Sequence, residues 1–126
     1  MTPCAIPFYF RRVTMKHIMR LNNEPFESIK NGTKTIELRL YDDKRRLLNI
    51  GDTIEFINRI NEDTILTKVI KLHIYKNFRE LYNHFNKTSL GYSENEEKNP
   101  DDMYKYYSEE EQNKYGVVGI EIKLIK

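Results

Sequence analysis

The chain has 126 residues, the length of a single domain, of which 39% are hydrophobic and 32% charged, with a net charge of +2. No apolar run approaches the roughly 20 residues of a membrane-spanning helix, so we expect no membrane partner. The one cysteine, Cys4, excludes an intrachain disulfide and a cysteine-based metal cluster, and it fits a reducing, cytoplasmic location.

The first fourteen residues, MTPCAIPFYFRRVT, differ in pattern from the rest of the chain. A signal peptide carries its positive charge before its apolar stretch, whereas Arg11 and Arg12 follow it here. We therefore interpret residues 1–14 as a leader or extra N-terminal segment and residues 15–126 as the domain. The strand-like AIPFYF within it leaves an extra edge strand open.

Residues 15–21, MKHIMRL, alternate loosely and predict the first strand. The stretch NNEPFESIKNG then predicts a short helix, with Asn23 as its cap, Pro25 in its first turn and Gly32 at its end. Because glycine adopts backbone conformations that other residues avoid, Gly32 permits a sharp corner between this helix and the next element.

The next predicted strand is KTIELRLY, residues 34–41, in which apolar and polar side chains alternate. Its apolar face carries Ile36, Leu38 and Leu40, and its polar face carries Thr35, Glu37 and Arg39. Lys34 lies between the glycine and the strand proper, so its side chain need not follow the alternation. We expect it to point toward Glu37.

Two further strands are predicted next, over residues 53–58 and 64–76. The residues expected to share one face of the longer strand are Leu66, Ile70, Leu72 and Ile74. Asn77 can then cap a helix running to about Lys87. The residues expected on the inner face of this helix are Phe78, Leu81, Tyr82 and Phe85.

An acidic, turn-rich connection, TSLGYSENEEKNP, leads to a helical turn from Pro100 through Tyr107. Ser108 and Glu111 have the spacing of a capping box, which predicts another helix. Gly116 then breaks the chain before a closing strand, VVGIEIKLIK. The residues on one face of that strand are Val118, Ile120, Ile122 and Leu124.

These five or six strands alternate in polarity rather than being apolar throughout, which favours a mostly antiparallel sheet with one solvated face. We predict an α+β fold, a small mostly antiparallel β-barrel with helices packed at its side. The three histidines, His17, His73 and His84, lack metal-ligand spacing, so we predict no metal site. Without a Walker loop or a dinucleotide fingerprint, we predict no cofactor.

The stretch GTKTIELR has the spacing G-x-K-x-x-E-x-R, formed by Gly32, Lys34, Glu37 and Arg39. With this motif, followed in order by IGDTIEF and YGVVGIEIKLI, the chain resembles the ASCH domain, a relative of the PUA RNA-binding domain. The resemblance covers residues 15–126. It implies a small barrel with a cleft between barrel and helices, lined by the motif, and a suspected role in binding RNA or a nucleotide.

In such a cleft the resemblance implies that Lys34 meets a phosphate or carbonyl, and that Arg39 offers a planar fork to phosphate, carboxylate or a base edge. Gly32 would form the corner beside them. Glu37 would hold the two cations, accept a base amino group, or act as a general base if burial raises its pKa. The structural alternative is an ion-pair cluster that only braces the corner.

Two other functions stay open at this point. One is a small hydrolase acting on a modified nucleoside or on RNA. Similar proteins hydrolyse an acetyl amide on cytidine nucleosides with a Thr nucleophile where this chain has Glu37, so a hydrolase of this kind would need Glu37 to activate water and Lys34 to stabilise an oxyanion. Alternatively, the segment 93–126, with 5 basic and 9 acidic residues against 16 and 10 in residues 1–92, contacts a regulatory protein partner.

Overall fold

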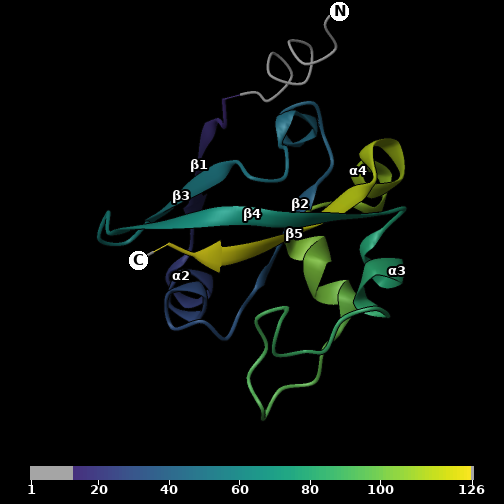
Figure 1. Cartoon of the computed structure of the whole chain (residues 1–126). Coiled ribbons are helices and arrows are strands. Elements are labelled where there is room, and N and C mark those ends of the chain that lie inside the picture. The colour runs from purple at the N-terminus through teal and green to yellow at the C-terminus, as the bar shows by residue number, and fades with distance from the viewer. Residues whose placement is uncertain (1–12, 126) are drawn as a thin grey trace, which may run out of the picture.

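The computed structural model describes residues 13–125, so the interpretation of AIPFYF lies outside the described residues. Five strands form one curved sheet in the order β1-β3-β4-β5-β2. Figure 1 shows the long strand β4 crossing the molecule beside β5, with α2 and α3 below it at opposite ends. The elements in chain order are β1 (Lys16–Leu21), α2 (Asn23–Lys30), β2 (Ile36–Leu40), η1 (Arg45–Leu47), β3 (Thr53–Asn58), β4 (Thr64–Tyr75), α3 (Phe78–Tyr82), η2 (Pro100–Lys105), α4 (Glu109–Tyr115) and β5 (Val117–Leu124).

The sheet curls into a half-barrel with helices packed alongside, which confirms the predicted α+β class. Strand pairs β3–β4, β4–β5 and β5–β2 are antiparallel, but β1 lies parallel to β3, so the sheet is mixed. Strands β1 and β2 are the two edges of the sheet and are not neighbours in it. The half-barrel is therefore open between them.

Two apolar clusters fill the space between the sheet and its helices. One forms around Phe26 and Ile29 of α2, which pack against strands β1, β3, β4 and β5. The other joins the apolar face of β2 to α3 and η2, with Leu81 fully buried. This second cluster therefore packs the edge strand β2 against α3 and η2.

The prediction that Leu66, Ile70, Leu72 and Ile74 share one face of β4 is wrong, although Leu72 packs against the core. Leu66, Ile70 and Ile74 are 37%, 40% and 50% exposed, whereas Thr67 and Val69 are buried. An irregularity between Val69 and Lys71 shifts the register. Odd-numbered residues before it, such as Val69, therefore lie on the same face as even-numbered residues after it, such as Leu72. Thr67 is tolerated inside because its hydroxyl donates a hydrogen bond to the Ile54 carbonyl at 2.9 Å.

Helix α3 ends at Tyr82, short of the predicted Lys87. The ammonium of Lys98 donates to the carbonyls of Tyr82 and Phe85, at 2.7 and 2.6 Å, and so satisfies acceptors that a longer helix would have used. The predicted cap of α2 is also displaced by one residue. Asn22 is the cap, and the Asn23 side chain instead accepts a hydrogen bond from Asn58.

The other predicted caps are confirmed. Asn77 accepts a hydrogen bond from the Glu80 amide at 2.9 Å at the start of α3. Ser108 and Glu111 form the capping box of α4. Gly116, with φ of 75°, breaks the chain between α4 and β5, and this backbone conformation favours glycine. These local features fix the ends of the elements that surround the open edge of the sheet.

Gly119→Ala tests how tightly α3 packs on β5. A Cβ at this position would lie 2.9 Å from Ile36 Cγ2 and 3.3 Å from Leu81 Cδ1, both in buried side chains. We expect the free energy of unfolding to fall by about 1–3 kcal/mol, measured from urea denaturation. An unchanged urea midpoint would show that α3 shifts without cost.

Candidate functional site

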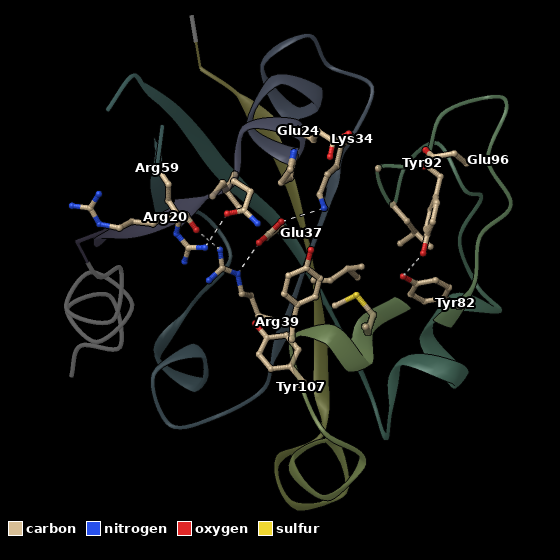
Figure 2. Close-up of a pocket in the computed structure, with 18 residues that line it drawn as sticks. Arg20, Glu24, Lys34, Glu37, Arg39, Arg59, Tyr82, Tyr92, Glu96 and Tyr107 are labelled. Carbon is tan, nitrogen blue, oxygen red and sulfur yellow. Dashed lines mark hydrogen bonds and ion pairs between the residues drawn. The ribbon is translucent and has the colours of Figure 1, made fainter. Parts of the chain in front are cut away.

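A pocket of about 290 Å³ lies at the open side of the half-barrel. Residues from β1, the start of α2, β2, the connection between α3 and η2, and η2 itself line it. Figure 2 shows Glu37 near its centre, with Arg20 and Arg59 toward one end and Tyr82 and Tyr92 toward the other. Elements distant in the sequence therefore supply its two ends.

The structure brings Lys34, Glu37 and Arg39 together at the floor of this pocket (Figure 2). Lys34 Nζ lies 3.3 Å from Glu37 Oε1, and Arg39 Nε lies 2.7 Å from Glu37 Oε2. Only 9%, 5% and 12% of the three side chains are exposed. The expected direction of the Lys34 side chain is therefore what the structure shows.

The corner before β2 gives Lys34 this position. After α2 ends, the amides of Thr33 and Lys34 both donate to the Ser28 carbonyl, so the chain turns across the end of the helix. Gly32, with φ of 87°, lies in this turn and does not line the pocket. Gly32 therefore forms the corner that the motif implied. It has no side chain to offer a ligand.

Charge in the floor is unbalanced, because two cations surround one carboxylate. Burial alone would raise the pKa of Glu37, but the neighbouring charges of Lys34 and Arg39 outweigh burial and lower it. Burial opposes the charge of Arg39, yet the Glu37 carboxylate raises the pKa of its guanidinium. Glu37 and Arg39 are thus both ionised near neutral pH, and with the Lys34 ammonium the formal charge of the floor is +1.

Arg39 also reaches across the open edge. Its Nη2 donates to the carbonyl of Arg20 in β1 at 3.1 Å, so one guanidinium contacts both edge strands. Glu37 holds the same guanidinium at Nε. The ion cluster therefore connects β2 to β1 at the place where the sheet lacks a strand-to-strand ladder.

The connection between α3 and η2 forms the opposite wall. The Tyr82 and Tyr92 hydroxyls lie 3.0 Å apart, and the Tyr92 hydroxyl is 2.7 Å from Asp102 Oδ2. Burial raises the pKa of both phenols, so they stay protonated and can donate. Gly91 packs against Lys34, because a Cβ there would lie 3.0 Å from Lys34 Cδ.

Arg20, Arg59 and Gly91 are pocket residues that the sequence analysis missed. No local pattern distinguishes them, because each reaches the pocket only through the pairing of β1 with β3 or the path of a connection without regular structure. Within residues 13–125, no three His, Cys, Asp or Glu side chains are grouped to hold a metal ion. No described helix is long and apolar enough to cross a membrane.

A five-strand half-barrel with helices alongside defines a PUA-like α+β domain. The chain belongs to the ASCH family, whose domain model matches residues 19–126. It is 36% identical to hypothetical protein PH0355, with a TM-score of 0.75 to the crystal structure over 88% of this chain and 100% of that one. It is 34% identical to protein PF0455 from Pyrococcus furiosus, with a TM-score of 0.64 to the solution NMR structure over 89% of this chain and 99% of that one. A comparison with curated proteins found no match.

Lys34→Met and Glu37→Gln should have opposite effects on stability. Removing Lys34 leaves the neutral Glu37–Arg39 pair, so we expect the free energy of unfolding at pH 7 to stay within about 1 kcal/mol or to rise. Removing the charge of Glu37 leaves two buried cations without the carboxylate that both contact, which should cost about 3–5 kcal/mol. Urea denaturation of both variants checks this, and equal losses would contradict the charge imbalance.

Glu37→Gln and the unmodified protein should also differ in how their stability depends on pH. The folded-state pKa of Glu37 is lowered, so its stabilising contribution is present above its unfolded-state pKa of about 4.3 and is lost as pH falls through the folded value. Unfolding measured between pH 7 and pH 3 should therefore show a smaller acid-dependent loss in Glu37→Gln than in the unmodified protein.

Gly91→Ala should disturb Lys34, whereas Gly32→Ala should not. Both glycines have positive φ, at 107° and 87°, so each alanine carries backbone strain of about 1–3 kcal/mol. Only the Gly91 substitution adds a contact to Lys34, since nothing lies within 4 Å of a Cβ at Gly32. We expect the NMR signals of the Lys34 side chain to shift in Gly91→Ala alone. Equal shifts in both variants would show that strain, not contact, is responsible.

Proposed function

We propose that the protein binds RNA or a nucleotide in the pocket lined by Lys34, Glu37 and Arg39. The observation that carries this proposal is the Lys34 ammonium. It has three N–H donors, it is buried, and among the described residues its one ion-pair partner is Glu37. A buried cation with unused donors beside a net positive charge is suited to an anionic or oxygen-rich ligand.

The rim of the pocket supports the same proposal. Arg20 and Arg59 lie at one end of the pocket, exposed to solvent and held only by surface contacts. Arg20 Nη1 is 3.4 Å from Glu62 Oε2, and Arg59 Nη1 donates to Asn22 Oδ1 at 3.2 Å. Exposed arginines of this kind contact phosphates through charge and a planar fork of donors.

An aromatic side chain completes the rim. Tyr106 lines the pocket and is 57% exposed, so its ring is accessible to a base. Stacking of a base on an exposed tyrosine contributes about 1–3 kcal/mol and tolerates different bases. ASCH domains have the PUA-like fold that is often linked to RNA binding, which agrees with phosphates on the arginines and a base in or over the pocket.

The hydrolase alternative, with Lys34 and Glu37 as catalytic residues, receives less support. A general base must be free to accept a proton, and both oxygens of Glu37 are occupied by cations. Its lowered pKa makes the carboxylate a weak base at neutral pH. The further alternative, in which the acidic segment 93–126 contacts a regulatory protein partner, stays a prediction. A cytoplasmic location and a domain over residues 15–126 preceded by a separate segment 1–14 are also predictions.

Arg20→Ala, compared with Arg79→Ala, tests the proposal. Both arginines are exposed and pair with one carboxylate at 3.3–3.4 Å, but Arg79 lies on α3 and does not line the pocket. In titrations with short single-stranded RNAs, we expect Arg20→Ala to weaken binding and to reduce the slope of log K against log salt by about 0.7, the value for one phosphate contact. Arg79→Ala should change neither.

Product analysis of the same mixtures separates binding from hydrolysis. Intact RNA after long incubation supports a binding module, whereas cleaved RNA or a released acyl group would favour the alternative. The proposal fails if no RNA or nucleotide in the panel binds at low salt, or if the two arginine variants weaken binding equally.

A further inference from the structure

The floor of the pocket presents more hydrogen-bond donors than acceptors, and both carboxylate oxygens of Glu37 already contact a cation. The Lys34 ammonium occupies Glu37 Oε1, and the Arg39 guanidinium occupies Oε2. An ionised carboxylate offers about four acceptor sites, and each of the two cations uses one of them. The two cations keep more free donors than Glu37 keeps acceptor sites, so the floor presents mainly donors to a ligand.

That capacity is considerable. Of the five N–H donors of Arg39, Nε binds Glu37 and one on Nη2 binds the Arg20 carbonyl. Within residues 13–125, no hydrogen-bond partner is present for Nη1, and this nitrogen is not among the fully enclosed side-chain atoms. Lys34 adds at least one further donor from the other side of Glu37. Donors thus flank the carboxylate on both sides.

The walls above this floor are partly apolar. Leu38, Leu90 and Met103 line the pocket, and all three are buried. A hydrated phosphate would lose its water against such walls without replacement, whereas the ring of a base gains from the same contact. The exposed Arg20 and Arg59 offer phosphates a better place at the rim.

We infer that the floor receives the C4 carbonyl oxygen of a pyrimidine or the C6 carbonyl oxygen of a purine, the base positions far from the ribose, so the pocket selects keto bases, uracil and hypoxanthine or guanine, over amino bases, cytosine and adenine. This inference rests on the proposed function and specifies its ligand. An amino group directed at Lys34 and Arg39 places donor against donor and leaves buried donors unpaired. Sites that hydrogen-bond a substrate group discriminate strongly against analogues that lack it.

Two pairs of monophosphates test the selection on the unmodified protein. UMP and CMP differ at the base by a keto against an amino group, and so do IMP and AMP. By isothermal titration, we expect UMP and IMP to bind roughly tenfold or more tightly than their amino counterparts, the effect of one hydrogen bond to a charged group. Ribose 5-phosphate, which carries the phosphate without a base, should bind more weakly than UMP.

A comparison of Lys34→Met with Lys30→Met tests whether the floor of the pocket causes the selection of keto over amino bases. Lys30 is an exposed lysine at the end of α2 and does not line the pocket. We expect Lys34→Met to lose most of the difference between UMP and CMP, and Lys30→Met to retain it. A thermal melt of each variant confirms that it is folded, and the comparison of nucleotides on the unmodified protein stands without either variant.

Each contrary result has a separate meaning. Equal binding of UMP and CMP, or tighter binding of CMP, overturns the selection while leaving nucleotide binding in place. Ribose 5-phosphate binding as tightly as UMP overturns it as well, because the floor would then hold a phosphate. If no nucleotide or short RNA binds, the proposed function itself fails.

Discussion

The guanidinium of Arg39 is the contact on which the open side of the half-barrel depends. Strands β1 and β2 are the edges of the sheet and share no ladder, and Arg39 joins them by donating to Glu37 within β2 and to the Arg20 carbonyl in β1. Its position requires Glu37 to stay ionised, which the two neighbouring cations ensure. The cluster is therefore a brace and the floor of a pocket at once. A structural role and a binding role are compatible here, since the brace uses some of the donors of Arg39 and leaves others available.

Lysine side chains fix the irregular wall of the pocket in place of regular structure. Lys98 binds the carbonyls of Tyr82 and Phe85, and Lys87 binds those of Glu94 and Glu96, at 2.6–2.7 Å. The Lys98 contacts satisfy carbonyls at and just after the end of α3, and the Lys87 contacts fold the following connection back on itself. The connection then presents Gly91 to Lys34 and Tyr92 to Tyr82. Two lysines in a segment rich in acidic residues thus act through backbone acceptors, where charge patterning alone suggests only a solvated surface.

Local sequence rules predicted the parts of the site that depend on local geometry. Alternation along β2 placed Glu37 and Arg39 on one face, and the Gly32 corner released Lys34 from that alternation. The same rules failed on β4, where an irregularity after Val69 changes the face that each residue presents, and on α3, which a lysine sixteen residues away ends. Arg20 and Arg59 were missed because they reach the pocket only through the parallel pairing of β1 with β3. The ASCH resemblance supplied the cleft, while the identity of its other walls required the tertiary structure.

The charge balance of the floor bears on why Lys34 is present. The two hydrogen bonds of the brace between β1 and β2 come from Arg39, so Lys34 contributes to the brace only through its charge, which helps to keep Glu37 ionised. Keeping this charge in a buried place has a desolvation cost, against which its 3.3 Å contact with Glu37 acts. Natural proteins retain costly arrangements mainly where function depends on them. In the proposed binding mode, a ligand oxygen approaches Lys34 and adds a second favourable contact to the one that Glu37 makes with this charge.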